Sequence, residues 1–155
     1  MGCWILEVMS NSFGESEAGL EFKIVHISHL RAHELPDEKR VNELFRIIRS
    51  RMAFTKPIVV DRETKIILDG HCRCGALRRL GCSKVAVKFV DYNSDEITVE
   101  SWNGGKVTKE EVIEAGLSGS LMLPKSSRHM VRVNAEKVHI SEICNKVAIA
   151  LEKLV

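Results

Sequence analysis

The chain has 155 residues, which is enough for one domain with a hydrophobic core and too few for two domains of ordinary size. Hydrophobic residues make up 45% of the chain and charged residues 28%, as in globular proteins, and the sequence holds no apolar run long enough to span a membrane. Because 23 basic residues are balanced by 21 acidic ones, the net charge of +2 argues against a nucleic-acid partner held by bulk electrostatics.

Strands and helices are predicted to alternate after a polar lead-in. Residues 1–20 are expected to form a mobile segment, followed by a single domain over residues 21–155. In chain order, the pattern predicts a strand over 22–27, a helix over 37–49, strands over 58–60 and 65–68, a helix over 71–80, strands over 84–90 and 96–102, and a helix over 108–117. A loop over 118–129, an extended segment over 130–139 and a final helix over 141–154 complete the prediction. This alternation indicates an α/β or α+β domain with a mixed sheet flanked by helices.

The cysteines indicate a reducing compartment. There are five of them, an odd number, and none are spaced as Cys-x-x-Cys. Cys72 and Cys74 lie two positions apart on a predicted helix, so their side chains point to different faces and make poor joint metal ligands. We therefore expect a cytoplasmic protein with free thiols and no structural zinc.

Residues 66–73 form the most informative stretch. An apolar strand ends in Asp69-Gly70, and a helix begins at His71. Free backbone N–H groups and the positive end of the helix dipole meet at such a junction and favour a bound phosphate. Arg73 can add a bidentate guanidinium, and His71 can donate a proton or a hydrogen bond. The alternative is a structural turn in which Asp69 caps the helix and the basic side chains are merely solvated.

A second polar cluster occupies residues 124–129, Pro-Lys-Ser-Ser-Arg-His, in the predicted loop. Lys125 and Arg128 supply charge, and the serines supply hydroxyls and a backbone that can form an N–H nest for phosphate. The alternative is a solvated basic loop.

Glu34 follows His33 in a loop ahead of a helix. Phosphoryl transfer to a hydroxyl needs a carboxylate that orients or deprotonates the acceptor, and Glu34 is a candidate for that role. The alternative is an exposed surface carboxylate. Trp102 can line a small-substrate pocket or, alternatively, pack in the core at a strand end.

Together these segments resemble the archaeal free-serine kinases of the ParB/sulfiredoxin-like superfamily. Asp69-Gly70-His71-Cys72-Arg73, followed by Ala76-Leu77-x-x-Leu80-Gly81, is similar to the Asp-Gly-His-His-Arg motif of those kinases. Residues 124–129 are similar to the Pro-Lys-Thr-Thr-Arg-His common in that family, and His33-Glu34 resembles its catalytic-glutamate loop. Segments 56–61, 101–110 and 117–119 also match in order, so the resemblance covers roughly residues 22–140.

The resemblance implies a single ParB/sulfiredoxin-like domain that phosphorylates free L-serine to O-phospho-L-serine with ADP or ATP and Mg²⁺. It implies catalytic roles for Glu34 as general base and for Asp69 and His71 at the reaction centre. Nucleotide or product phosphate would contact Gly70, Cys72, Arg73, Lys125, Ser126, Ser127, Arg128 and His129. The serine pocket would be lined by Trp102 and His33. We expect no membrane or nucleic-acid partner, because the chain has no apolar run long enough to span a membrane and is nearly neutral.

Three other functions within the superfamily remain as alternatives: a nucleotide-binding regulator, a sulfiredoxin and a DNA-binding ParB-like module. The nearly neutral charge disfavours DNA binding. A nucleotide-binding regulator without catalysis would have no need of Glu34. Sulfiredoxins place a nucleophilic cysteine in their motif, but that cysteine aligns with His71 rather than with Cys72. Cys72 itself replaces the second histidine of the kinase motif, and is tolerated if only its backbone N–H contacts phosphate.

Overall fold

The computed structural model describes residues 22–155, so the predicted lead-in over residues 1–20 lies outside the described part. A four-stranded sheet forms the centre, in the order β1 (Lys23–His26), β5 (Lys84–Val90), β3 (Ile58–Asp61) and β4 (Ile67–Asp69). β3 and β5 run parallel, whereas the β1–β5 and β3–β4 pairs are antiparallel. The predicted mixed sheet is therefore confirmed.

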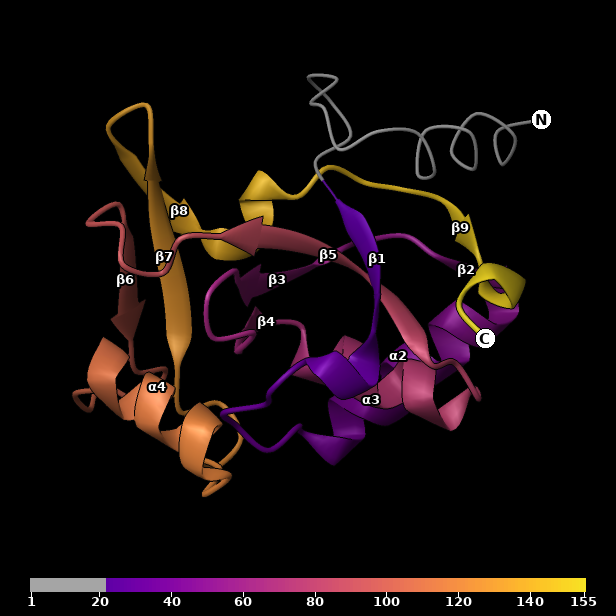
Figure 1. Ribbon diagram of the computed structural model, residues 1–155, viewed down its shortest axis with the longest axis horizontal. Helices are drawn as coiled ribbons and strands as arrows, with labels where there is room; N and C mark the ends of the chain where they lie inside the picture. Colours follow the sequence, from indigo (N-terminus) through magenta and orange to yellow (C-terminus); the bar gives the residue numbers. More distant parts are fainter. Residues whose placement is uncertain (1–21) are drawn as a thin grey trace.

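Two helices pack together on one face of this sheet (Figure 1). Helix α2 (Glu38–Arg51) is capped by Asp37, whose carboxylate accepts the Lys39 N–H at 3.1 Å. Helix α3 (His71–Arg79) follows β4 directly. The contact between the helices is close because Gly75 presents no side chain to Val41: a Cβ there would lie 3.2 Å from the nearest Val41 methyl.

A second, three-stranded antiparallel sheet lies on the opposite side of the molecule, with helix α4 (Lys109–Ser118) beside it (Figure 1). Its strands are β6 (Ile97–Glu100), β7 (Arg128–Val133) and β8 (Glu136–His139). Thr108 and Glu111 form the predicted capping box at the start of α4.

Strands β3 and β4 supply residues to two separate hydrophobic cores. Alternation along a strand sends Ile58 and Val60 to the core beneath α2 and α3, and sends Val59 to the core beneath the second sheet. Ile67 and Leu68 divide between the cores in the same way. The end of β4, where Asp69 lies, therefore opens between the two packed halves. No helix in residues 22–155 is long and apolar enough to cross a bilayer.

The chain after residue 118 differs from the prediction in two places. β7 already begins at Arg128, and the extended segment is a hairpin in which Asn134 and Ala135 both have positive φ. The predicted final helix over 141–154 is wrong. That segment instead contains a 3-10 turn over Ile140–Ile143, strand β9 (Ile149–Ala150) and a second 3-10 turn over Leu151–Lys153.

Pairing with distant strands explains why the final helix does not form. β9 pairs with β2 (Ala53–Phe54), and the carbonyl of Leu154 accepts the N–H groups of Ser83 and Lys84. Ile149, Leu151 and Leu154 are thereby buried in the core beneath α2 and α3. These tertiary partners outweigh the local helical spacing.

Candidate functional site

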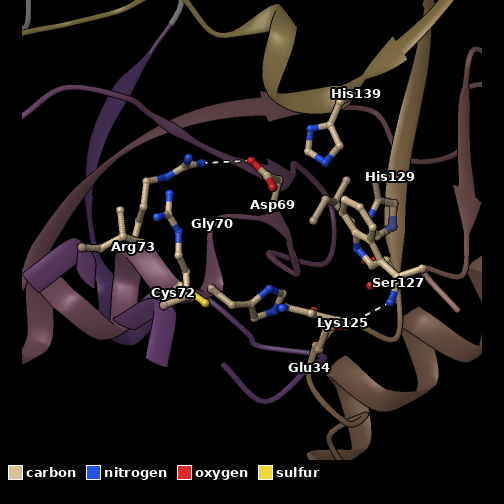
Figure 2. Close-up of a pocket in the computed structure, with 14 residues that line it drawn as sticks. Glu34, Asp69, Gly70, Cys72, Arg73, Lys125, Ser127, His129 and His139 are labelled. Carbon is tan, nitrogen blue, oxygen red and sulfur yellow. Dashed lines mark hydrogen bonds and ion pairs between the residues drawn. The ribbon is translucent and has the colours of Figure 1, made fainter. Parts of the chain in front are cut away.

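A cavity of about 510 Å³ opens where β4 ends and α3 begins (Figure 2). One side, the helix wall, comprises Arg40, Leu44, Gly70, His71, Cys72 and Arg73 from α2 and the start of α3. The other side, the sheet wall, comprises Trp102, Ser127, His129 and His139 from the second sheet and its approaches. Between them lie Glu34, Leu68, Asp69 and Lys125.

The start of α3 is open for an anion. Gly70 is the N-cap residue and provides no side-chain cap, so N–H groups of the first turn need another partner. Gly70 has φ +113°, and a Cβ there would lie 2.3 Å from the Ile58 Cγ2 atom, so only glycine fits. Asp69 does not cap the helix, so the alternative of a structural turn capped by Asp69 does not hold.

Asp69 instead pairs with Arg73. Arg73 donates from Nη2 to Asp69 Oδ2 at 2.9 Å and to the Pro57 carbonyl at 3.3 Å. Its Nε is buried and has no hydrogen-bond partner within residues 22–155. The ion pair fixes a guanidinium beside the helix N-terminus, which strengthens the attraction of this wall for phosphate.

Glu34 is held by the loop that the sequence assigned to phosphate. Its Oε1 accepts the backbone N–H groups of Ser126 and, at 3.0 Å, of Ser127. Burial raises the pKa of the Glu34 carboxyl, while these N–H groups oppose the rise. Both backbone bonds go to Oε1, which leaves Oε2 without a backbone hydrogen bond among residues 22–155. A half-buried carboxylate in this setting is not the solvated surface group of the alternative interpretation.

His33 lies behind the cavity and ties together both of its sides. Its Nδ1 donates to the Ile67 carbonyl at 2.7 Å, so its Nε2 accepts the Ser127 hydroxyl, also at 2.7 Å. Burial lowers the pKa of His33 to about 4. The imidazole is therefore neutral near pH 7 and acts as a connecting group rather than as a cation.

Two further imidazoles reach the cavity in the neutral form. His71 Nε2 accepts the His33 N–H at 3.3 Å, and burial, with the neighbouring His33 and His129, holds the pKa of His71 well below its usual value. His129 is hydrogen-bonded through Nε2 to the Tyr92 hydroxyl at 2.8 Å, and burial lowers the pKa of His129 to about 3. These rings can form hydrogen bonds with a substrate, but the fixed positive charge of the site comes from the arginines and Lys125.

The structure brings most of the predicted site residues together. Three of them do not line the cavity: His33, Ser126 and Arg128. The Arg128 guanidinium lies over the Trp102 ring, 4.6 Å from its centroid, and Trp102 Nε1 donates to the Ser127 carbonyl at 3.1 Å. Trp102 is 52% exposed, which excludes the alternative of a core tryptophan.

Sequence reasoning missed four lining residues: Arg40, Leu44, Leu68 and His139. Arg40 and Leu44 lie within the helix predicted over 37–49, and nothing local marks the face of α2 that meets α3. His139 reaches the site only through the β7–β8 hairpin, whose register the sequence does not show. Within residues 22–155, no three acidic, histidine or cysteine side chains are grouped to hold a metal ion by themselves.

Comparison with known proteins gives sequence relatives among ParB-like proteins and serine kinases. No protein-family profile matches the chain. A ParB-like protein of Sulfolobus acidocaldarius is 40% identical over 74 residues, which is 48% of this chain and 37% of the relative. An ATP-dependent L-serine kinase of Desulfurococcus mucosus is 32% identical over 103 residues, 61% of this chain and 40% of the relative. The chain thus spans about two fifths of the length of the curated relatives it matches.

Solved structures share the fold. A free serine kinase in complex with AMP superposes with a TM-score of 0.74 at 16% identity, covering 93% of this chain and 98% of that one. A conserved hypothetical protein from Pyrococcus furiosus gives the same TM-score and identity, covering 88% and 98%. The described domain therefore has the free serine kinase fold. The sequence relatives named L-serine kinase confirm the resemblance seen in the motifs.

Proposed function

We propose that this domain is a nucleotide-dependent kinase that phosphorylates the hydroxyl of free L-serine. The observation that carries the proposal is the presence, in one cavity, of an uncapped helix N-terminus with a fixed guanidinium and of Glu34 held by two backbone N–H groups. Phosphoryl transfer needs these two parts together, an anion clamp and an oriented carboxylate. The names of the sequence relatives support free L-serine as the acceptor.

The terminal phosphoryl group of the donor would lie at the helix wall. The first-turn N–H groups of α3, Arg73 and Lys125 would hold the phosphates, and Cys72 would contribute its backbone N–H rather than its side chain. The serine Oγ would attack the terminal phosphorus and pass its proton to Glu34 Oε2. As the new P–O bond forms, the bond to the bridging oxygen breaks and releases AMP from ADP, or ADP from ATP. Neutral His71 would donate a hydrogen bond to the transferred group.

Mg²⁺ fits this arrangement as a companion of the nucleotide. The ion usually binds through one or two carboxylates together with substrate phosphates and water, so a site without a ready cluster of protein ligands suits it. Asp69 would be its protein ligand, because only Oδ2 is committed to Arg73. Bound there, Mg²⁺ would neutralise developing charge on the phosphates.

Glu34 also separates this proposal from a nucleotide-binding regulator without catalysis. A carboxylate beside an anion site repels phosphate, and burial has already made its charge costly. A pure binder would gain only the anchoring of the loop at Ser126 and Ser127, whereas a kinase would also gain its base. The proposal includes a cytoplasmic location, where nucleotide and free amino acids are available, and no nucleic-acid or membrane partner.

The direct test is product formation. Purified protein is incubated with Mg²⁺, ADP or ATP, and L-serine, L-threonine or L-homoserine, and the mixture is followed by ³¹P NMR. We expect a phosphomonoester resonance from O-phospho-L-serine with at least one of the two donors. Nucleotide binding without a phosphorylated product from any acceptor would contradict the proposal and favour the regulator.

A further inference from the structure

His139 ends strand β8 and points into the cavity from the sheet wall. In Figure 2 its ring is directed toward the space between Asp69 and His129. No motif marked it in the sequence. We propose that His139 binds the carboxylate of the acceptor amino acid and so makes the site specific for free amino acids over simple alcohols. This inference rests on the proposed function, because it assigns a residue to the acceptor of that reaction.

Hydrogen bonds fix which nitrogen of His139 carries the proton. The Ser141 backbone N–H, which can only donate, lies 3.1 Å from Nδ1, and the Ser141 hydroxyl lies 2.8 Å from the same atom. Nδ1 is therefore the acceptor, and the neutral ring carries its proton on Nε2. Nε2 has no hydrogen-bond partner among residues 22–155, so a defined N–H donor is presented to the cavity without any rearrangement.

The other side-chain donors of the sheet wall are either paired or buried. Trp102 Nε1 donates to the Ser127 carbonyl, and the Ser127 hydroxyl donates to His33. His129 is hydrogen-bonded to Tyr92 through Nε2, and its Nδ1 is buried without a hydrogen-bond partner among residues 22–155. Among the described residues, His139 Nε2–H is thus the unpaired side-chain donor of this wall that is not buried, and a ligand placed against the wall must meet it.

The division of charge decides which part of the substrates His139 meets. Arg40 and Arg73 belong to the helix wall, and Lys125 is tied to that side by its 3.2 Å ion pair with Asp37. Strand β7 carries two arginines, and neither lines the cavity: Arg128 is stacked on Trp102, and Arg132 lies further along the strand. Nucleotide phosphates therefore favour the helix wall, which leaves the acceptor against the sheet wall. The anionic group of that acceptor is its carboxylate, for which a fixed N–H donor beside an aromatic ring is a suitable partner.

Ligand binding tests the assignment without needing turnover. Dissociation constants for L-serine and for ethanolamine, which keeps the hydroxyl and the ammonium but has no carboxylate, are measured by calorimetry. AMP is present, so that no phosphoryl donor is supplied. The variants are His139→Ala and His139→Gln, whose amide can replace the Nε2–H donor. His29→Ala, which replaces an exposed histidine whose ring lies beside that of His26, is the matched control.

We expect His139→Ala to weaken L-serine binding roughly 10- to 100-fold, the usual loss for a hydrogen bond to a charged group, and to leave ethanolamine within twofold. His139→Gln should recover part of the loss, and His29→Ala should behave as the wild type. Equal weakening of both ligands, an unchanged affinity for L-serine, or no preference for L-serine in the wild type would overturn the inference, as would a lack of L-serine binding. A wild type that binds L-serine through His139 but forms no O-phospho-L-serine would refute the proposed function alone.

Discussion

Replacing Glu34 separates its chemical role from its structural one. In Glu34→Gln, the amide oxygen can still accept the N–H groups of Ser126 and Ser127, so the loop keeps its place. The amide nitrogen, however, stands where Oε2 would take the serine proton. We expect kcat for phosphoserine formation to fall by about 10² to 10⁴, the usual contribution of a general base, with nucleotide affinity unchanged within about twofold.

Glu34→Ala supplies the contrast because it removes the acceptor as well as the base. Two backbone donors then lose their partner in a half-buried loop, which costs about 1 to 3 kcal/mol. For a domain of this size, that corresponds to a fall of roughly 2 to 12 °C in Tm. The Ala variant should therefore lose both turnover and stability, whereas the Gln variant should lose turnover alone.

Two assays distinguish these outcomes. Product formation at saturating nucleotide and serine gives kcat, and thermal unfolding followed by circular dichroism gives Tm. A Gln variant with wild-type kcat would refute the assignment of Glu34 as the base. A Gln variant that unfolds as readily as the Ala variant would show that the carboxylate is needed only to hold the loop.

Three further predictions concern acid stability, the turn before α3 and the stacked arginine. Burial lowers the pKa of His33 to about 4 and that of His129 to about 3, whereas free imidazoles titrate near 6.5. Below pH 6.5 the unfolded chain therefore binds more protons than the folded protein does. The free energy of unfolding, measured with urea, should fall by about 2 kcal/mol per imidazole between pH 7.5 and pH 5. Equal free energies of unfolding at the two pH values would contradict this. Gly70→Ala should cost at least about 2 kcal/mol by thermal unfolding, because its Cβ would clash with β3, whereas Gly81→Ala, with positive φ but open space, should cost about 1 kcal/mol. Similar losses would refute the steric argument. Arg128→Ala should raise KM for serine about 2- to 30-fold and leave nucleotide affinity unchanged, because the guanidinium is stacked on the Trp102 ring at the acceptor side of the cavity. A selective loss of nucleotide binding would instead indicate that Arg128 contacts phosphate.

Local signals explain which parts of the fold could be predicted from the sequence. The junction of β4 and α3 follows from an apolar strand, a glycine and a helical pattern that are contiguous in the chain. The capping box of α4 is likewise complete within four residues, Thr108 to Glu111. In both places neighbouring residues determine the structure, so no distant partner is needed to recognise it.

The remaining parts depend on contacts between distant segments. Residues 141–154 carry helical spacing, yet their apolar side chains fill a core whose shape is set by β2 and α3. The sequence of residues 124–129 predicted a nest of backbone N–H groups for phosphate, but it does not show that the N–H groups of Ser126 and Ser127 bind Glu34, 92 positions away from Ser126. His139 joins the site only once the register of β7 and β8 is known.

The central claim is that this cavity transfers a phosphoryl group to free L-serine rather than to water. The measurement that tests it most directly is the ratio of O-phospho-L-serine formed to nucleotide consumed, both quantified by mass spectrometry in one incubation with Mg²⁺ and saturating serine. We predict one phosphoserine for each ADP converted to AMP, or for each ATP converted to ADP. Nucleotide consumption that yields inorganic phosphate and no phosphoserine would contradict the claim.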